Sequence, residues 1–344
     1  IFFVSWTNIF PVMVDDMIED YQASAPAQEK ETLRQHFAIA SIHHQKPAHH
    51  VVATSLFWKP AHDGSQDYPS PTREVMENPG NEGLELRYKN PWEYYVEPVF
   101  KTARELAETR PDLTYRVYLA NDLAFLIPEL GEAGCEVYLM ESSSILHNPG
   151  AMWRFLAMEE EGLVTLNDSD RAKWLIHDVE RTEGLAKGPL SYWRCPYMWE
   201  TAECKDLGSP GGYHPYSAAM MGSTKPLPIR LLAEAFIWSC QKGIIRGECQ
   251  IGERTAPILG SQWPEYGFDE FFLAAAFHPR AAFEGIMSFV NWKNHKLNQW
   301  FALDIEYTTW ANPASEIMFW GNPSEVSEDE TSKAAVSKPN ETPA

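Results

Sequence analysis

Two aspartates that stand one residue apart, Asp168 and Asp170, follow a short apolar stretch at residues 163–166. Aspartate, asparagine and serine are common turn formers, so this Asp-Ser-Asp triplet can simply turn the chain and cap the helix that follows. The same spacing places two hard carboxylate oxygens on one side of an extended segment, as a Mg²⁺ or Mn²⁺ site requires. A cation bound in this way often holds a substrate phosphate as well. The triplet alone leaves both interpretations open.

The elements around this triplet alternate between strands and helices. We expect strands at residues 1–6, 51–58, 114–120, 135–141 and 163–166, and helices at residues 28–40, 91–110, 123–130 and 150–161. This order predicts an α/β fold with a Rossmann-type, largely parallel central sheet flanked by helices. Ligands of such sheets bind beyond the carboxyl ends of the strands, where Asp168 and Asp170 lie. The predicted fold therefore strengthens the metal interpretation.

The rest of the chain is less regular. We expect a polar loop at residues 41–50, a long loop at 59–91, a strand at 189–196, and helices at 171–184, at 229–243 and from Asp269 onward. The pattern of residues 229–243 predicts a strongly amphipathic helix. Residues 323–344 contain no aromatic residue and few apolar ones, so we expect a disordered acidic tail there.

The 344-residue chain is strongly acidic, with a formal net charge of −20. DNA, RNA and anionic membranes attract basic surfaces, so this charge argues against a nucleic-acid partner and against attachment to a membrane through basic residues. No apolar run approaches the length of a membrane span and no signal peptide is recognisable, although the chain begins with Ile1 rather than methionine. The five cysteines are odd in number and form no Cys-x-x-Cys pair, so we expect reduced thiols in a cytoplasmic protein rather than a disulfide framework or a zinc site.

Several short motifs follow one another in an informative order. They are Trp153-Arg154-Phe155-Leu156, Asp168-Ser169-Asp170, Arg194 in a predicted strand, Ala218-Ala219-Met220-Met221-Gly222, and Tyr266-Gly267-Phe268-Asp269-Glu270. This order, over about residues 51–290, resembles a group of nucleotide-sugar glycosyltransferases with the GT-A fold. The resemblance implies one GT-A-like domain over residues 1–322, with a nucleotide-sugar half at about 1–170 and an acceptor half at about 171–322.

The resemblance implies that Asp168 and Asp170 hold Mn²⁺ or Mg²⁺ against a nucleoside diphosphate, with Asp170 as the direct metal ligand. A divalent cation stabilises the negative charge that grows on the diphosphate as the glycosidic bond breaks. In this fold a late histidine is sometimes a third ligand, and the candidates are His295 and His278.

The same resemblance implies contacts with the donor from a further set of residues, namely Asp168, Trp153, Arg154, Arg194 and Gly222. The Arg154 guanidinium can hold the diphosphate or the sugar. It can equally form an ion pair, either at the surface with Glu159 or Glu160 or as a buried pair that fixes the helix. Gly222 can allow the backbone to approach a sugar closely, or it can permit tight packing between a helix and the sheet.

Asp269 and Glu270 are the catalytic candidates that the resemblance implies. An acidic group there would act as a general base on an acceptor hydroxyl, or stabilise the oxocarbenium-like centre. An aspartate at a helix start also satisfies backbone amides and complements the helix dipole, so a purely structural role is the alternative. Tyr213 and His214, which follow a Gly-Gly turn, are the candidates on the acceptor side.

Together these features predict a metal-dependent hexosyltransferase that moves a sugar from a nucleotide sugar, most simply a UDP-sugar, to a hydroxyl of a glycan or another acceptor. The chain departs from the family pattern at Asn167, where the family has arginine, at Glu270, where it has glutamine, and after Asp170, where a Ser-Arg-Glu pattern is missing. These departures keep two alternatives open. One is a non-catalytic carbohydrate-binding protein on a degenerate GT-A fold, and the other is a metal-dependent nucleotide-sugar hydrolase.

Overall fold

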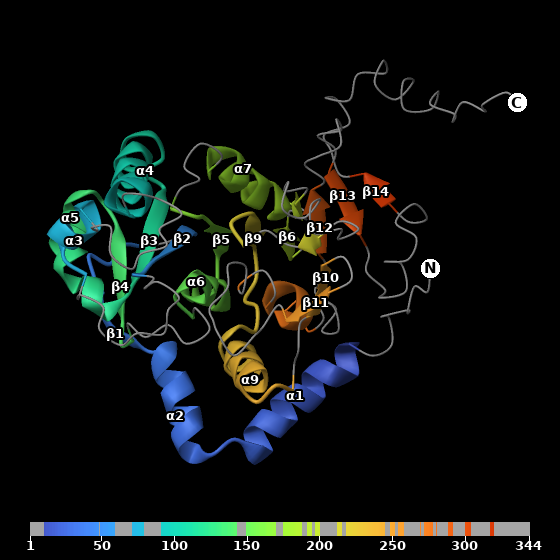
Figure 1. The fold of residues 1–344 in the computed structure, drawn as a ribbon. Helices are drawn as coiled ribbons and strands as arrows, with labels where there is room; N and C mark the ends of the chain where they lie inside the picture. The colour runs from blue at the N-terminus through green and yellow to red at the C-terminus, as the bar shows by residue number, and fades with distance from the viewer. Residues whose placement is uncertain are drawn as a thin grey trace, which may run out of the picture.

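A ten-stranded mixed sheet with helices on both faces forms the centre of the protein in this computed structural model (Figure 1). The protein therefore belongs to the α/β class. The structure describes residues 10–47, 49–58, 71–78, 91–142, 149–169, 175–187, 191–194, 197–199, 212–214, 218–244, 248–251, 254–257, 269, 272–277, 280, 288–291, 300–303 and 317–319.

Four neighbouring strands of the sheet are parallel, and all four come from the first half of the chain. In spatial order they are β4 (Glu136–Met140), β3 (Leu113–Leu119), β2 (His50–Leu56) and β5 (Leu163–Leu166). Every residue of β2 and of β3 is buried. Such continuous burial is expected where helices cover both faces of a parallel sheet, and it explains the apolar, β-branched sequence of β2.

Antiparallel strands extend the sheet on both sides of this parallel core. Strand β1 (Ile39–His43) pairs with β4 at one edge. On the other side, β9 (Met221–Ser223) lies between β5 and β6 (Tyr192–Arg194) and is antiparallel to both. The sheet then continues through β12 (Ser288–Asn291), β13 (Trp300–Leu303) and β14 (Ile317–Phe319). Two separate hairpin-like sheets consist of β7 (Tyr197–Trp199) with β8 (Gly212–His214) and of β10 (Glu248–Ile251) with β11 (Arg254–Pro257).

Helices cover the two faces of the sheet, with α4 and α7 above the strands and α6 and α9 below them in Figure 1. Helix α4 (Glu97–Thr109) packs on β3, and α7 (Leu175–Leu185) packs on β5, β6 and β9. On the opposite face, α6 (Pro149–Met152) and the 3-10 helix η4 (Trp153–Glu159) pack on β2. The remaining helical segments are η2 (Trp92–Val96), η3 (Asn121–Leu126), α5 (Ile127–Glu132) and η6 (Leu273–Phe277).

Helix α9 (Arg230–Gln241) is more deeply buried than its sequence predicts. All residues from Leu232 to Ser239 are buried, so the prediction of a strongly amphipathic helix is wrong. The reason is that α1 (Phe10–Ser24) and α2 (Ala27–His36) cover its outer side, and α1 was not anticipated from the sequence. The buried Glu234 accepts a hydrogen bond of 3.0 Å from the Tyr21 hydroxyl of α1, and burial raises the pKa of Glu234.

Most predicted elements of the described residues are confirmed with small shifts of their ends. The confirmed elements are the strands β2, β3, β4, β5 and β6 and the helical regions at 91–110, 123–130, 150–161, 171–184 and 229–243. The predicted strand at residues 1–6 and the predicted tail at 323–344 lie outside the described residues.

Three local predictions are wrong. The predicted loop at residues 41–50 contains most of β1, whose residues are partly exposed, as an edge strand permits. The helix predicted to reach residue 40 ends at His36, because the fully buried Phe37 begins the turn into β1. The predicted long loop contains the short helix α3 (Arg73–Glu77), which Thr72 caps by accepting a hydrogen bond from the Val75 backbone amide.

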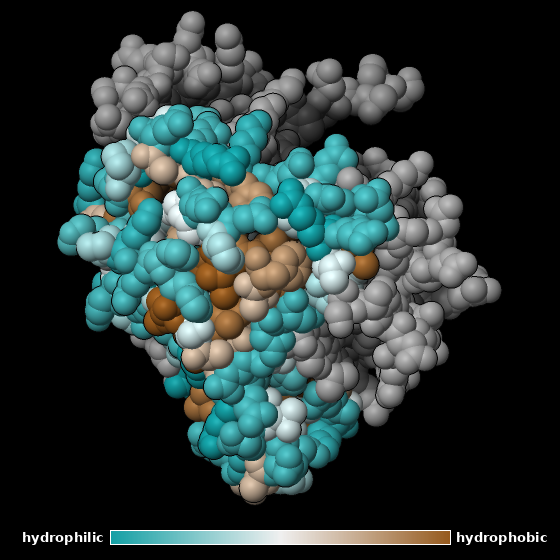
Figure 2. Space-filling model, turned by 90° about the vertical axis from the view of Figure 1, so that its left-hand side faces the viewer, coloured by the Kyte–Doolittle hydropathy of each residue, from teal (hydrophilic) through white to brown (hydrophobic). Residues whose placement is uncertain are grey.

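The surface over α3, α4, α5 and β1 is mainly hydrophilic, with an apolar area near its centre (Figure 2). The large apolar side chains that are exposed in the described residues include Ile42, Tyr95 and Phe125. None of the helices in the described part of the chain is long and apolar enough to cross a membrane.

Candidate functional site

The order of the parallel strands creates a switch point between β2 and β5. From β2 the chain proceeds outward to β3 and then β4, and it returns to place β5 on the other side of β2 (Figure 1). In open α/β sheets, ligands bind in the crevice beyond the carboxyl ends of the strands at such a point. Asn167 and Asp168 directly follow the carboxyl end of β5. The sheet therefore places Asp168 where this class of fold binds its ligands.

Arg154, Asp168 and Asp269 come together and form a cluster, called the Arg154 cluster below. The Arg154 guanidinium donates from Nη1 to Asp168 Oδ1, and from Nη2 to Asp269 Oδ2 over 2.6 Å. The Arg154 side chain is 5 % exposed, that of Asp269 10 % and that of Asp168 36 %. Arg154 and Asp269 stand 115 residues apart in the chain. Three residues chosen from three separate motifs are thus in direct contact.

Apolar packing and a backbone hydrogen bond fix both segments of the cluster. The Arg154 backbone amide donates to Ser55 Oγ, near the carboxyl end of β2, over 2.9 Å. The neighbouring Phe155 stacks on Phe272 with a ring distance of 6.0 Å, and Phe236 of α9 packs against Phe272 with a ring distance of 5.5 Å. Because Phe272 lies only three residues after Asp269 in the chain, this aromatic contact helps to hold the two partners of the buried ion pair together.

Asn167, where the chain departs from the family pattern, points into the protein. Its side chain is 2 % exposed, and Nδ2 donates to the Tyr115 hydroxyl over 3.2 Å. Its backbone amide donates to the Ala53 carbonyl over 2.9 Å, which continues the pairing of β5 with β2. Successive side chains of an extended segment point to opposite sides, so the inward position of Asn167 leaves Asp168 on the solvent side.

The charged groups of the Arg154 cluster suit a cation that is itself bound to oxygen acceptors. The carboxylates attract the cation, and the guanidinium can donate hydrogen bonds to the oxygens. One guanidinium faces two carboxylates, so the cluster has an excess of one negative charge when all three groups are ionised. Asp168 supplies a partly exposed hard oxygen donor, which is the type of ligand that Mg²⁺ and Mn²⁺ prefer. In the described ranges, no three His, Cys, Asp or Glu side chains are arranged as a metal site. Asp168 is therefore the candidate metal ligand that the structure describes.

A buried donor at the same edge of the sheet was not singled out from the sequence. Trp58, two residues beyond the end of β2, is 6 % exposed, and its indole Nε1 has no hydrogen-bond partner among the described residues. Buried polar atoms are usually satisfied, so this donor is available for a hydrogen bond to a ligand at the switch point. Its only sequence signal was its position after a buried strand.

Trp153 lies in the core rather than at a surface. It is fully buried, its Nε1 donates to the His36 carbonyl over 2.6 Å, and its ring packs edge-on against Phe57. The indole has no exposed surface, so the structure gives Trp153 a packing role, and its contact with a donor stays a prediction. It serves the site by fixing η4, which carries Arg154, against the end of α2.

Gly222 is packed tightly between α7 and the sheet. A Cβ atom at this position would lie 2.1 Å from Thr182 Oγ1 and 2.3 Å from Trp193 Nε1. Within β9, Gly222 pairs with Thr165 of β5 and with Trp193 of β6. This packing explains the glycine without a sugar ligand.

A Gly222→Ala variant is therefore expected to lower the free energy of unfolding by about 1–3 kcal/mol, because the added methyl group forces neighbouring atoms apart. Gly184→Ala is the matched control: it lies in α7, and its Cβ would meet no atom within 4 Å. This control is expected to stabilise the protein by about 0.5–1 kcal/mol. Urea denaturation of both variants measures the difference, and equal stabilities would contradict the packing explanation.

The other predicted site residues are placed only in part. Arg194 lies in β6, and Tyr213 and His214 lie in β8, but the structure describes only their backbone. Four further candidates lie outside the described residues, namely Asp170, Glu270, His278 and His295.

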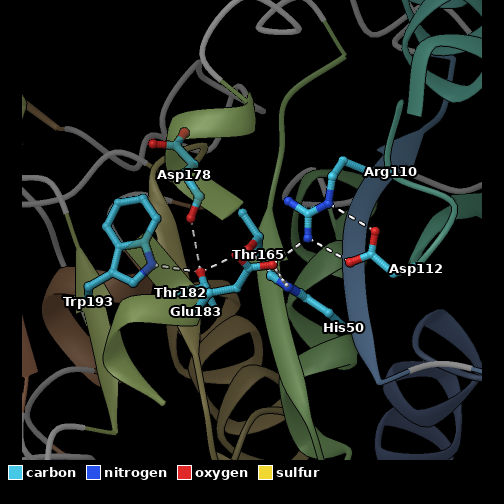
Figure 3. A network of polar contacts seen from close by, with 8 residues as sticks. All are labelled: His50, Arg110, Asp112, Thr165, Asp178, Thr182, Glu183 and Trp193. Atoms are coloured by element: carbon cyan, nitrogen blue, oxygen red, sulfur yellow. Dashed lines mark hydrogen bonds and ion pairs between the residues drawn. The ribbon is translucent and has the colours of Figure 1, made fainter. Parts of the chain in front are cut away.

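A second polar cluster lies at the amino end of β2 (Figure 3). His50 bonds through Nε2 to Thr165 Oγ1 at 2.8 Å, and Thr165 donates to Thr182 of α7 at 2.8 Å. Burial lowers the pKa of His50 to about 4, although Glu183 at 3.6 Å opposes this shift. The histidine is therefore neutral near pH 7, and the cluster joins α7 to the sheet at the end opposite the Arg154 cluster.

Comparison with protein-family models and with curated proteins gives no match to this chain. The function is therefore argued from the Arg154 cluster and its place in the fold.

Proposed function

We propose that the protein is a metal-dependent glycosyltransferase of the GT-A type, which transfers a sugar from a nucleotide-sugar donor to an acceptor hydroxyl. The observation that carries the proposal is the Arg154 cluster at the switch point of the sheet. Arg154, Asp168 and Asp269 belong to three motifs of the resemblance, and a chance likeness of short motifs gives no reason for their residues to meet at a ligand-binding edge.

The cluster supports a division of roles among its residues. Asp168, with Asp170, is proposed to hold Mn²⁺ or Mg²⁺, which when bound acts as a Lewis acid on the diphosphate leaving group. Arg154 is suited to bind diphosphate oxygens, since a guanidinium fork matches them with two parallel hydrogen bonds. Asp269 is proposed to lie near the reacting carbon, as a general base for the acceptor hydroxyl or as a stabiliser of positive charge on the sugar.

The strongly acidic composition is compatible with an anionic donor. A bound divalent cation and a local arginine reverse the sign of the electrostatic field inside a site, whatever the net charge of the chain. The net charge of −20 favours a glycan or another uncharged hydroxyl acceptor over a nucleic acid. A cytoplasmic location is proposed for the enzyme, because its five cysteines, an odd number, do not suit a disulfide framework.

A thermal-shift screen of nucleotide sugars, each with and without Mn²⁺, tests the donor site. A UDP-sugar is expected to raise the melting temperature only with Mn²⁺, because the metal is proposed to hold its diphosphate. A ligand at a hundred times its Kd stabilises the native state by about 2.7 kcal/mol. Asp168→Asn is expected to lose the shift, since the neutral amide no longer provides a charged metal ligand. Asp20→Asn, the same change at an exposed position of α1, is expected to keep it.

The pattern of shifts also separates the proposal from its alternatives. A shift that does not depend on the metal would favour a non-catalytic carbohydrate-binding protein. Release of free sugar at one rate with and without acceptors would favour a hydrolase. If no nucleotide sugar raises the melting temperature, with or without Mn²⁺, the Asp-Ser-Asp triplet is a turn and the proposal fails.

A further inference from the structure

Arg154 binds two carboxylates that differ in their access to water. Its contact with Asp269 is buried, since neither side chain is more than 10 % exposed. Its contact with Asp168 lies at the edge of the cluster, where the Asp168 side chain is 36 % exposed. A buried carboxylate depends on its cation, whereas water or another cation can replace the partner of an exposed one. The Asp269 contact is therefore the lasting one, and the Asp168 contact is the one that can be exchanged.

A divalent cation that coordinates Asp168 would meet the positive charge of Arg154 at short range. Two like charges repel each other more strongly in a partly buried site than in water. A diphosphate removes this conflict, because its oxygens accept hydrogen bonds from the guanidinium while they also coordinate the cation. Cation and diphosphate should therefore bind better together than either binds alone, which is a coupling free energy between two ligands.

We propose that Arg154 couples metal binding to diphosphate binding in this protein. In the ligand-free protein Arg154 donates to both Asp168 and Asp269. When metal and diphosphate are bound, Arg154 releases Asp168 to the metal and donates to the diphosphate. It keeps its buried contact with Asp269 and so also acts as a positioning residue for that carboxylate. The inference rests on the proposed function, since it takes a metal-diphosphate site at Asp168 as its premise.

Binding of Mn²⁺ tests this coupling without any assay of transfer. Electron paramagnetic resonance measures free Mn²⁺ during titrations of the protein with MnCl₂ alone, with UDP and with GDP. In the wild type, one of these nucleotides is expected to tighten Mn²⁺ binding roughly tenfold or more. In Arg154→Gln, Mn²⁺ alone is expected to bind more tightly, because the repelling charge is gone, and the nucleotide effect is expected to fall about tenfold.

Two further variants make the result decisive. Arg154→Lys keeps the charge but not the fork of donors, so Mn²⁺ alone should bind as weakly as in the wild type, with a reduced nucleotide effect. Arg116→Gln is the matched control, because Arg116 of β3 is also buried between two carboxylates, those of Glu136 and Glu160. It is expected to lower stability and to leave the coupling unchanged.

Each contradicting result identifies which idea fails. If Arg154→Gln weakens Mn²⁺ binding equally with and without nucleotide, Arg154 is only structural and the inference is overturned. If Arg154→Gln does not fold, an unchanged coupling in Arg154→Lys overturns it instead. A wild-type protein that binds Mn²⁺ neither alone nor with a nucleotide overturns the proposed function, and the inference loses its premise.

Discussion

An Asp269→Asn variant is expected to bind metal and nucleotide sugar almost as the wild type does, but to transfer the sugar at least about 100-fold more slowly. Removal of a positioned general base or of a stabilising charge typically costs about 10²–10⁴-fold in rate. The amide keeps the shape of the carboxylate, and its oxygen can still accept the Arg154 Nη2 hydrogen bond that is 2.6 Å long in the native protein. The fold and the donor site should therefore survive the change.

Initial rates of nucleoside diphosphate release measure this effect, with melting shifts under the same conditions as the measure of donor binding. Asp168→Asn provides the contrast, since it is expected to lose the metal-dependent melting shift as well as the rate. Asp20→Asn is expected to lose neither. A wild-type rate in Asp269→Asn would exclude Asp269 as a catalytic residue and leave it a structural partner of Arg154.

The central part of the fold could be predicted because local sequence patterns specify it. The run of β-branched and apolar residues in β2 indicates a strand that is buried on both faces, and β2 is buried throughout. The burial of α9 could not be predicted, because it depends on α1, which is more than 200 residues away in the chain. The edge strand β1 was also missed, because a partly exposed strand carries the polar residues of a loop.

The candidate site, too, could be predicted from the sequence only in part. The position of Asp168 after a buried strand could be predicted from the order of strands and helices. Its contact with Arg154, 14 residues away, and that of Arg154 with Asp269, 115 residues away, could not, because no local pattern encodes which side chains of separate elements will meet. The motifs of the resemblance selected these three residues separately. They also selected Trp153 and Gly222, whose types suit a ligand site and a packed core equally well, and the structure gives both a packing role.

The second large effect concerns stability, at a buried ion pair between β3 and β4. Arg116, 3 % exposed, donates to two carboxylates at the same distance of 2.6 Å, from Nε to Glu136 and from Nη1 to Glu160. The two acceptors differ in burial: the Glu136 side chain is 1 % exposed and the Glu160 side chain 44 %. Arg116 also lies over the Tyr138 ring, 4.1 Å from its centre.

Glu136→Ala is therefore expected to lower the free energy of unfolding by about 3–5 kcal/mol, because the buried Arg116 loses its only buried carboxylate in the described structure. Glu160→Ala, at an equal distance from the same arginine, is expected to cost only about 0–1 kcal/mol, since water can solvate the guanidinium edge that faces it. Urea denaturation of the two variants compares one arginine in two environments. Equal losses would mean that burial does not determine the strength of these ion pairs. The same rule, applied to Arg154, is what makes Asp269 its lasting partner and Asp168 its exchangeable one.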